Sequence, residues 1–147
     1  MPLMRPAEVA DIDAMHRVRT SVRENKLVSM VLPPSRYIEY LESRGRGWVI
    51  EADGAVVAFA IADSRDGSLW ALFVDPEHEG KGYGRRLHDA AVTWLFEVGH
   101  DRVWLTTSPG TRAQRFYERA GWTDAGPAPQ GERRLELANS QPASRTG

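Results

Sequence analysis

The stretch LWALFVDPEHEGKGYGRRLHDAAVTWL, residues 69–95, places an apolar run directly before a glycine-rich segment and a helical pattern. The six apolar residues at 69–74 predict a strand that is covered on both faces and lies at the centre of a sheet. From Gly82 the period becomes helical, and Gly99 provides the stop. The residues expected on the buried face of this helix are Leu87, Ala91, Trp94, Leu95 and Val98. A strand, a tight loop and a helix in series indicate an α/β fold.

The segment before this stretch contains two helical patterns and a hairpin. Apolar spacing predicts a helix over residues 12–22, with Asp11 as its N-cap. A shorter helix is expected around residues 37–41, ended by the glycines of SRGRG. Strands 48–50 and 56–61 flank Asp53-Gly54, a strong signal for a two-residue hairpin. A second hairpin is expected at Asp66-Gly67, so these strands adjoin the central one.

The segment after it continues the alternation. Residues 103–106 predict a strand, followed by a helix with Ser108 as N-cap and Pro109 at its first position. That helix is expected to end near Ala120-Gly121. Two further strands, around 122–123 and 134–137, flank a loop rich in Gly and Pro. The predicted order is strand, two helices, three strands, helix, strand, helix and two strands.

Composition narrows the possible functions. The 147 residues suit one domain, expected over 1–138, and the polar residues 139–147 predict a disordered tail. The absence of Cys excludes disulfides, thiolate metal sites and a thiol nucleophile. A formal net charge of -1 argues against nucleic acid as a partner. With no apolar run of roughly 20 residues and no leader pattern, we expect no membrane association and a soluble, cytoplasmic protein. A homodimer is a general expectation.

The glycine-rich loop points to an anion. Glycine at every second position lets the backbone approach a ligand, and a helix N-terminus with Lys81, Arg85 and Arg86 nearby favours a diphosphate. A dinucleotide-binding GxGxxG motif is excluded because Arg and Leu occupy positions 85 and 87. A P-loop is excluded because Gly80-Lys81 is followed by Gly82. A glycine-rich turn without a ligand remains an alternative.

Two segments together resemble the GNAT superfamily of acyl-CoA-dependent N-acyltransferases. The run LFVDPEHEGKGYGRRL, 72–87, is similar to its acyl-CoA signature Q/R-x-x-G-x-G/A, with Glu79 where Gln or Arg is usual. We expect Glu79 to point into solvent or toward an Arg. The run AQRFYERAGW, 113–122, resembles the family helix N-x-x-A-x-x-F-Y-x-x-x-G-F, with Gly110 in place of Asn and Trp122 in place of Phe.

The resemblance implies an α/β fold: a single GNAT-like domain with a twisted mixed central β-sheet flanked by about four helices. It implies transfer of an acetyl group from acetyl-CoA to a primary amine, of a small molecule or a protein, by direct attack in a ternary complex. Tyr117 matches the general acid, and the central strand would splay from its neighbour. The implied cofactor-binding residues are Leu72, Phe73, Val74, Gly80, Lys81, Gly82, Tyr83, Gly84, Arg85 and Phe116.

The general base and the acceptor site have no single candidate. Ser68 lies where some family members carry a Glu, and a Ser cannot take a proton from an amine at neutral pH. Candidates for the base are His16, Glu24 and Glu51. Candidates to wall the acceptor pocket are Trp70 and Trp104, and candidates to hold an acceptor carboxylate are Arg19, Arg23 and Arg112. His78, His88 and His100 lack metal-ligand spacing, so no metal is predicted.

Two other functions remain open at this point. The departures at Ser68, Glu79 and Gly110 fit a non-catalytic acyl-CoA-binding sensor of the same fold. A nucleotide-binding α/β module would use the same loop to bind phosphate.

Overall fold

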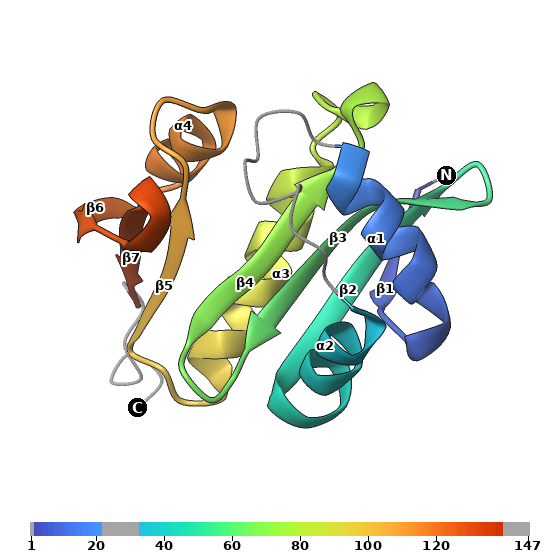
Figure 1. The fold of residues 1–147 in the computed structure, drawn as a ribbon, viewed down its shortest axis with the longest axis horizontal. Helices are drawn as coiled ribbons and strands as arrows, with labels where there is room; N and C mark the ends of the chain where they lie inside the picture. The colour runs from blue at the N-terminus through green and yellow to red at the C-terminus, as the bar shows by residue number, and fades with distance from the viewer. Residues whose placement is uncertain (1, 22–32, 140–147) are drawn as a thin grey trace, which may run out of the picture.

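The computed structural model describes residues 2–21 and 33–139. The elements are β1 (Leu3–Pro6), η1 (Val9–Asp11), α1 (Ile12–Ser21), α2 (Pro34–Glu39), η3 (Tyr40–Arg44), β2 (Gly45–Ala52), β3 (Ala55–Asp63), β4 (Ser68–Val74), η4 (Pro76–His78), α3 (Tyr83–Glu97), β5 (Arg102–Thr107), α4 (Arg112–Arg119), β6 (Thr123–Pro127), η5 (Pro129–Gly131) and β7 (Arg133–Ala138). This order confirms the predicted succession of strands and helices. Figure 1 shows the sheet running across the molecule with helices on both sides.

The sheet is mixed, and its strands lie in the order β1-β2-β3-β4-β5-β7-β6. Strand β4 occupies the middle position, as predicted. All neighbouring strands are antiparallel except β4 and β5. Those two are parallel and share one register pair, Ser68 with Trp104, whereas β3 and β4 share six, from Ala58–Val74 to Asp63–Ser68. The strands therefore separate beyond Ser68, which confirms the splay implied by the resemblance.

Two apolar clusters pack on opposite faces of the sheet. On one face α3 contributes Leu87 and Leu95 to a cluster that includes Ala60 of β3. On the other face Met15 of α1 packs with Tyr37 of α2 and with β3. Figure 1 shows α1 and α2 in front of the strands and α3 behind them. Helix α4 supplies Tyr117 to the α3 cluster, so it shares that face.

Both predicted hairpins are present. Asp53 and Gly54 connect β2 to β3 with φ of 54° and 81°, the left-handed pair that a type I′ turn requires. Gly67, with φ of 78°, precedes β4. The short helical segment that begins with α2 continues through η3 and ends at Arg44, directly before the predicted glycine stop.

Both predicted N-caps are wrong. Helix α4 begins at Arg112 with Thr111 as N-cap, whose side chain accepts a hydrogen bond from the Gln114 N–H. Ser108 cannot cap the helix because Gly110, with φ of 77°, lies between Ser108 and the first helical residue. The Ser108 hydroxyl instead donates a hydrogen bond to Glu132. Asp11 ends the η1 turn, where its carboxylate accepts from the Glu8 N–H at 2.8 Å rather than capping α1.

Two burial predictions are also wrong. Val98 follows the last residue of α3 and is 49% exposed, because the chain turns away from the sheet there. The second half of β4, from Leu72 to Val74, is only half-buried since β5 does not cover it. The predicted tail lies outside the described residues from 140 onward. Within the described part of the chain, none of the helices has the length and apolar composition needed to cross a bilayer.

We expect Leu95→Ala to lower the free energy of unfolding by about 2–5 kcal/mol because it opens a cavity under α3. Val98→Ala should cost less than about 0.5 kcal/mol, since its side chain is half exposed. Urea unfolding followed by circular dichroism measures both variants. Equal losses would contradict the packing of the two positions.

Candidate active site

A cavity of about 450 Å³ lies where β4 and β5 separate. It is lined by both strands, by the loop before α3, by α4 and by Arg19 of α1. Since α1 and α3 cover opposite faces of the sheet, the cavity passes between the strands from one face to the other. Every cofactor-binding residue implied by the resemblance lines it except Lys81, which is exposed and outside its wall.

The open edge of β4 supplies backbone groups to this cavity. The Asp75 N–H donates to the Val57 carbonyl at 2.8 Å, so Asp75 faces β3. Successive residues of a strand point their N–H and C=O groups to alternate edges. The backbone N–H and C=O groups of Leu72 and Val74 therefore face the gap between β4 and β5. Phe73 pairs with Phe59 of β3, and its side chain lines the cavity.

The loop after β4 has the geometry of an anion site. Gly80 and Gly82 have φ of 80° and 83°, and a Cβ at either would have no atom within 4 Å. Glycine is therefore required by the backbone, not by crowding within the chain. Helix α3 begins at Tyr83, directly after Gly82, so its first N–H groups and positive dipole end face the cavity wall. A bound diphosphate would be stabilised there.

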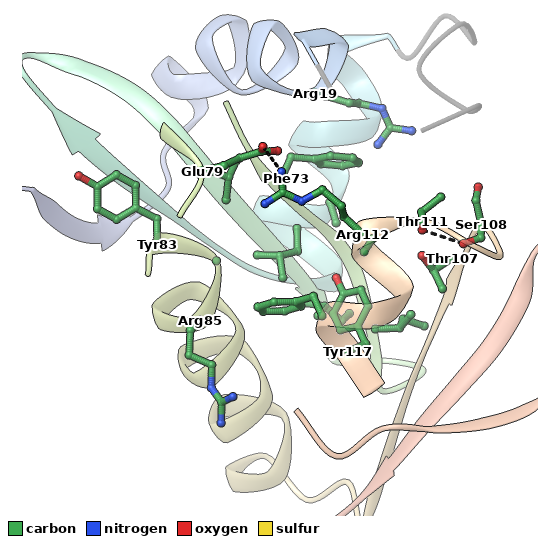
Figure 2. A pocket seen from close by; sticks show the side chains of 18 of the residues that line it. Arg19, Phe73, Glu79, Tyr83, Arg85, Thr107, Ser108, Thr111, Arg112 and Tyr117 are labelled. Atoms are coloured by element: carbon green, nitrogen blue, oxygen red, sulfur yellow. Dashed lines mark hydrogen bonds and ion pairs between the residues drawn. The ribbon is translucent and has the colours of Figure 1, made fainter. Parts of the chain in front are cut away.

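Charged side chains around this loop are largely paired. The Arg112 guanidinium donates to Glu79 at 2.6 Å, which confirms that Glu79 points toward an arginine. Arg85 bonds Asp89 one turn along α3, at 3.1 Å. The dashed line in Figure 2 joins Glu79 and Arg112 across the mouth of the cavity. The acidic residue in the motif is thus neutralised by α4.

Tyr117 lies at the inner wall of the cavity. Figure 2 shows its ring on α4, with the hydroxyl directed into the space beside β4. Phe116 and Trp122 pack against the ring edge-on, with centroids at 5.2 and 5.6 Å. No described residue forms a hydrogen bond with the hydroxyl. Burial raises the pKa of Tyr117 well above its ordinary value, so the phenol keeps its proton at neutral pH.

His88 supports this wall and was not predicted to belong to the site. Its Nε2 accepts a hydrogen bond from the Trp122 indole at 2.9 Å, and its Nδ1 contacts Asp89 at the same distance. Burial lowers the pKa of His88, so the ring is neutral and Nδ1 carries its proton. The ring lies 6.4 Å from that of Tyr117 and fixes Trp122 behind it.

The base candidates from the sequence do not reach the cavity. The His16 Nδ1 pairs with the Tyr37 hydroxyl at 3.1 Å, and Glu51 accepts from Arg5 at 2.6 Å. Neither lines the cavity wall. Glu24 and Arg23 lie outside the described residues. Ser68 is buried at the closed end of the gap, where the strands still pair.

Of the two tryptophans predicted to wall the acceptor pocket, one lines the cavity and the other does not. Trp70 lines the cavity and stacks on Tyr40, with ring centroids 3.9 Å apart. Trp104 does not line it; its indole N–H donates to the Asp66 carbonyl, and Arg134 covers its ring. Only Trp70 therefore fits the expectation.

Glu132 is a cavity carboxylate that sequence reasoning missed. It is buried, lines the cavity beside the end of β5, and accepts a hydrogen bond from Ser108 at 2.6 Å. Its other carboxylate oxygen has no hydrogen-bond partner in the described chain. The only sequence signal is weak: Glu132 follows the Gly/Pro-rich loop and directly precedes the last strand. It reaches the site because β7 returns antiparallel to β5.

Residues 2–21 and 33–139 contain no group of three or more His, Asp or Glu side chains placed to hold a metal ion.

Comparison with known proteins decides the family. Residues 15–122 match the Acetyltransferase (GNAT) family. The chain belongs to the GNAT acetyltransferase family. Mycothiol acetyltransferase of Beutenbergia cavernae is 37% identical over 82 residues, which are 52% of this chain and 28% of that protein. The same enzyme of Propionibacterium freudenreichii subsp. shermanii is 41% identical over 68 residues, 43% of this chain and 22% of that protein. The matched segments thus span less than a third of these relatives.

Solved structures share the fold at low identity. An N-acetyltransferase from Staphylococcus aureus Mu50 has a TM-score of 0.78 and 17% identity, covering 94% of this chain and 98% of its own. The PaiA N-acetyltransferase from Thermoplasma acidophilum, solved in complex with coenzyme A, has a TM-score of 0.74 and 14% identity, covering 95% and 99%. These GNAT structures confirm the predicted single GNAT-like fold.

The groups that line the cavity of this GNAT protein are chemically suited to the parts of coenzyme A. A helix N-terminus with two left-handed glycines suits the diphosphate, and the unpaired edge at Leu72 and Val74 suits the amide groups of a pantetheine arm. Phe116 and Gly84 form the apolar wall between them, since a Cβ on Gly84 would lie 3.7 Å from the Phe116 ring.

We expect Gly82→Val to weaken binding of coenzyme A by tenfold or more. Left-handed backbone costs an L-residue roughly 1–2 kcal/mol, and the branched side chain would also occupy space in front of the α3 N-terminus. Isothermal titration with coenzyme A gives the dissociation constant. Gly54→Val is the matched control, because Gly54 has nearly the same φ and equally open surroundings but lies in the β2–β3 hairpin. Unchanged affinity in Gly82→Val would contradict the phosphate site.

Proposed function

We propose that this protein transfers an acetyl group from acetyl-CoA to a primary amine through a ternary complex. The observation that carries the proposal is the open edge of β4, which leads from the α3 N-terminus past Leu72 and Val74 to the Tyr117 hydroxyl. Membership of the GNAT family and the mycothiol acetyltransferase relatives support an amine-acetylating reaction. The acceptor is a small-molecule or protein amine that enters from the α1 face.

The chain's own groups divide the work of the reaction. The N–H groups at the start of α3 and of the preceding loop bind the diphosphate. A backbone N–H on the open edge, from Leu72 or Val74, polarises the thioester carbonyl and stabilises the oxyanion when the amine nitrogen attacks its carbon. A C–N bond forms and the C–S bond breaks.

Tyr117 then delivers a proton to the departing thiolate. A phenol that stays protonated at neutral pH and has no hydrogen-bond partner in the described chain can serve this step without first breaking a bond. Glu132 accepts the proton that the ammonium loses, directly or through one water. Ser108 fixes one oxygen of that carboxylate and leaves the other for the amine.

Assays of thiol release with acetyl-CoA and a panel of amines test the proposal. Release of free coenzyme A that depends on the amine supports transfer. Tight binding of coenzyme A without release would instead indicate a sensor of the same fold. Thermal stabilisation by ATP but not by acetyl-CoA would indicate a nucleotide-binding module, since saturating ligand at 100 times its dissociation constant adds about 2.7 kcal/mol.

Tyr117→Phe should lower kcat by roughly 100-fold or more, because the general acid is lost while the ring packing stays. The affinity for coenzyme A should change little, since the phosphate loop is untouched. Stopped-flow detection of thiol release gives kcat, and titration gives the affinity. An unchanged kcat would reduce Tyr117 to a packing residue of α4.

Glu132→Gln should lower kcat/KM at neutral pH by about 100-fold, and the loss should shrink as pH rises and more amine is deprotonated in solution. Gln still accepts the Ser108 hydrogen bond, so the fold is retained. Glu118→Gln, an exposed change on α4 outside the cavity, is the control. A loss in Glu132→Gln that is the same at all pH values would argue for a structural role.

A further inference from the structure

Arg19 occupies a distinct position in the cavity. It lies in the last turn of α1, and its guanidinium carbon is 5.2 Å from the centre of the Phe73 ring. Figure 2 shows it above Phe73, on the side of the cavity away from Tyr117. Its Nε is buried and has no hydrogen-bond partner in the described chain. A cation is therefore held against an aromatic wall instead of extending into water.

Other arginines along the wall are satisfied or solvated. Arg112 is paired with Glu79, Arg85 is paired with Asp89, and Arg119 is exposed. In the described chain, the ionisable group that interacts electrostatically with Arg19 is the Tyr37 phenol. This phenol is neutral at physiological pH, so it supplies no negative charge. Burial lowers the pKa of Arg19, because desolvation disfavours the charged guanidinium. Partly buried charge of this kind is costly unless an anion pairs with it.

The position of Arg19 separates it from the coenzyme's phosphates. Phe73, which it covers, belongs to the cluster on the α1 face, whereas the phosphate loop precedes α3 on the opposite face. An anion at Arg19 must therefore belong to the acceptor, which approaches the thioester from the α1 side. The partial negative charge at the C-terminal end of α1 opposes any anion, and it opposes a doubly charged phosphate more than a singly charged carboxylate.

We infer that Arg19 binds a carboxylate on the acceptor, so that the substrate class is amines that also carry a carboxylate. This inference rests on the proposed function. The guanidinium fork matches a carboxylate in a bidentate pair, and the Phe73 ring limits its rotation. The attacking nitrogen would then lie between this anchor and the open edge of β4. Arg19 acts here as a specificity-determining residue.

The first test detects binding without turnover. A proton–nitrogen correlation spectrum of the full chain with coenzyme A bound resolves arginine Nε–H signals, and the Arg19 signal is identified by its loss in Arg19→Met. Titration with γ-aminobutyrate should shift that signal. γ-Aminobutyramide, which keeps the amine and loses the charge, should not. Equal shifts with both compounds, or none with either, would overturn the inference.

The second test is kinetic. With acetyl-CoA, kcat/KM for an aminocarboxylate should exceed that for its amide by roughly 10- to 100-fold, the range expected for a charge-assisted pair. Arg19→Met should remove this preference by lowering kcat/KM for the aminocarboxylate toward that for its amide, and Arg19→Lys should restore part of the preference. Arg17→Met, an exposed change on the same helix, should have no effect. A higher kcat/KM for aminopropylphosphonate than for the aminocarboxylate would overturn the assignment of a carboxylate.

The outcomes distinguish this inference from the proposed function. Transfer to amines and aminocarboxylates at equal rates would overturn the role of Arg19 and leave the acetyltransferase intact. A carboxylate-dependent shift of the Arg19 signal without thiol release from any amine would overturn the proposed catalysis and retain the binding site.

Discussion

The single register pair between β4 and β5 is the constraint on which the site depends. The two strands are held together at one end, where the Trp104 N–H donates to the Gly67 carbonyl and its indole to Asp66. His100 bonds the Ser64 carbonyl at the same end, at 2.6 Å. Beyond that end β5 takes its hydrogen bonds from β7 and β4 from β3. An unpaired strand edge is normally a liability, and here it is enclosed by α3 and α4 as a cavity wall.

The two ends of the cavity differ chemically because α3 contributes its N-terminus to one end and α1 contributes its last turn to the other. On one face, the N-terminus of α3 contributes positive potential and left-handed glycines, which suits a diphosphate. On the other face, Arg19 in the last turn of α1 contributes a positive charge that can pair with one anionic group. Tyr117 and Glu132 lie along the passage between these ends. Donor and acceptor can therefore meet at the gap without competing for one anion site.

Local patterns were sufficient to predict most of the fold and the glycine-rich loop that lines the cavity before α3. Alternating apolar runs, the Asp53-Gly54 turn and the glycines before α3 encode their structure within a few residues. The N-cap of α4 was misplaced because Gly110, in left-handed conformation, breaks the backbone between Ser108 and the helix. Glu132 was missed because its place in the site depends on β7 packing beside β5, a distant segment. Arg19 was one of three arginine candidates, and the sequence could not single it out because its position depends on Phe73 packing beneath α1.

Glu79 shows how a residue that conflicts with its local motif is accommodated by tertiary structure. A carboxylate beside a diphosphate site would repel the ligand, but Arg112 donates to it at 2.6 Å from the first residue of α4. The two side chains are 34% and 63% exposed, so the pair adds at most about 1 kcal/mol to folding. Its effect is therefore mainly electrostatic: it cancels one negative charge at the cavity mouth and links the phosphate loop to the helix that carries Tyr117. The same ion pair also commits Arg112 to the loop, which leaves Arg19 as the half-buried arginine facing the acceptor side.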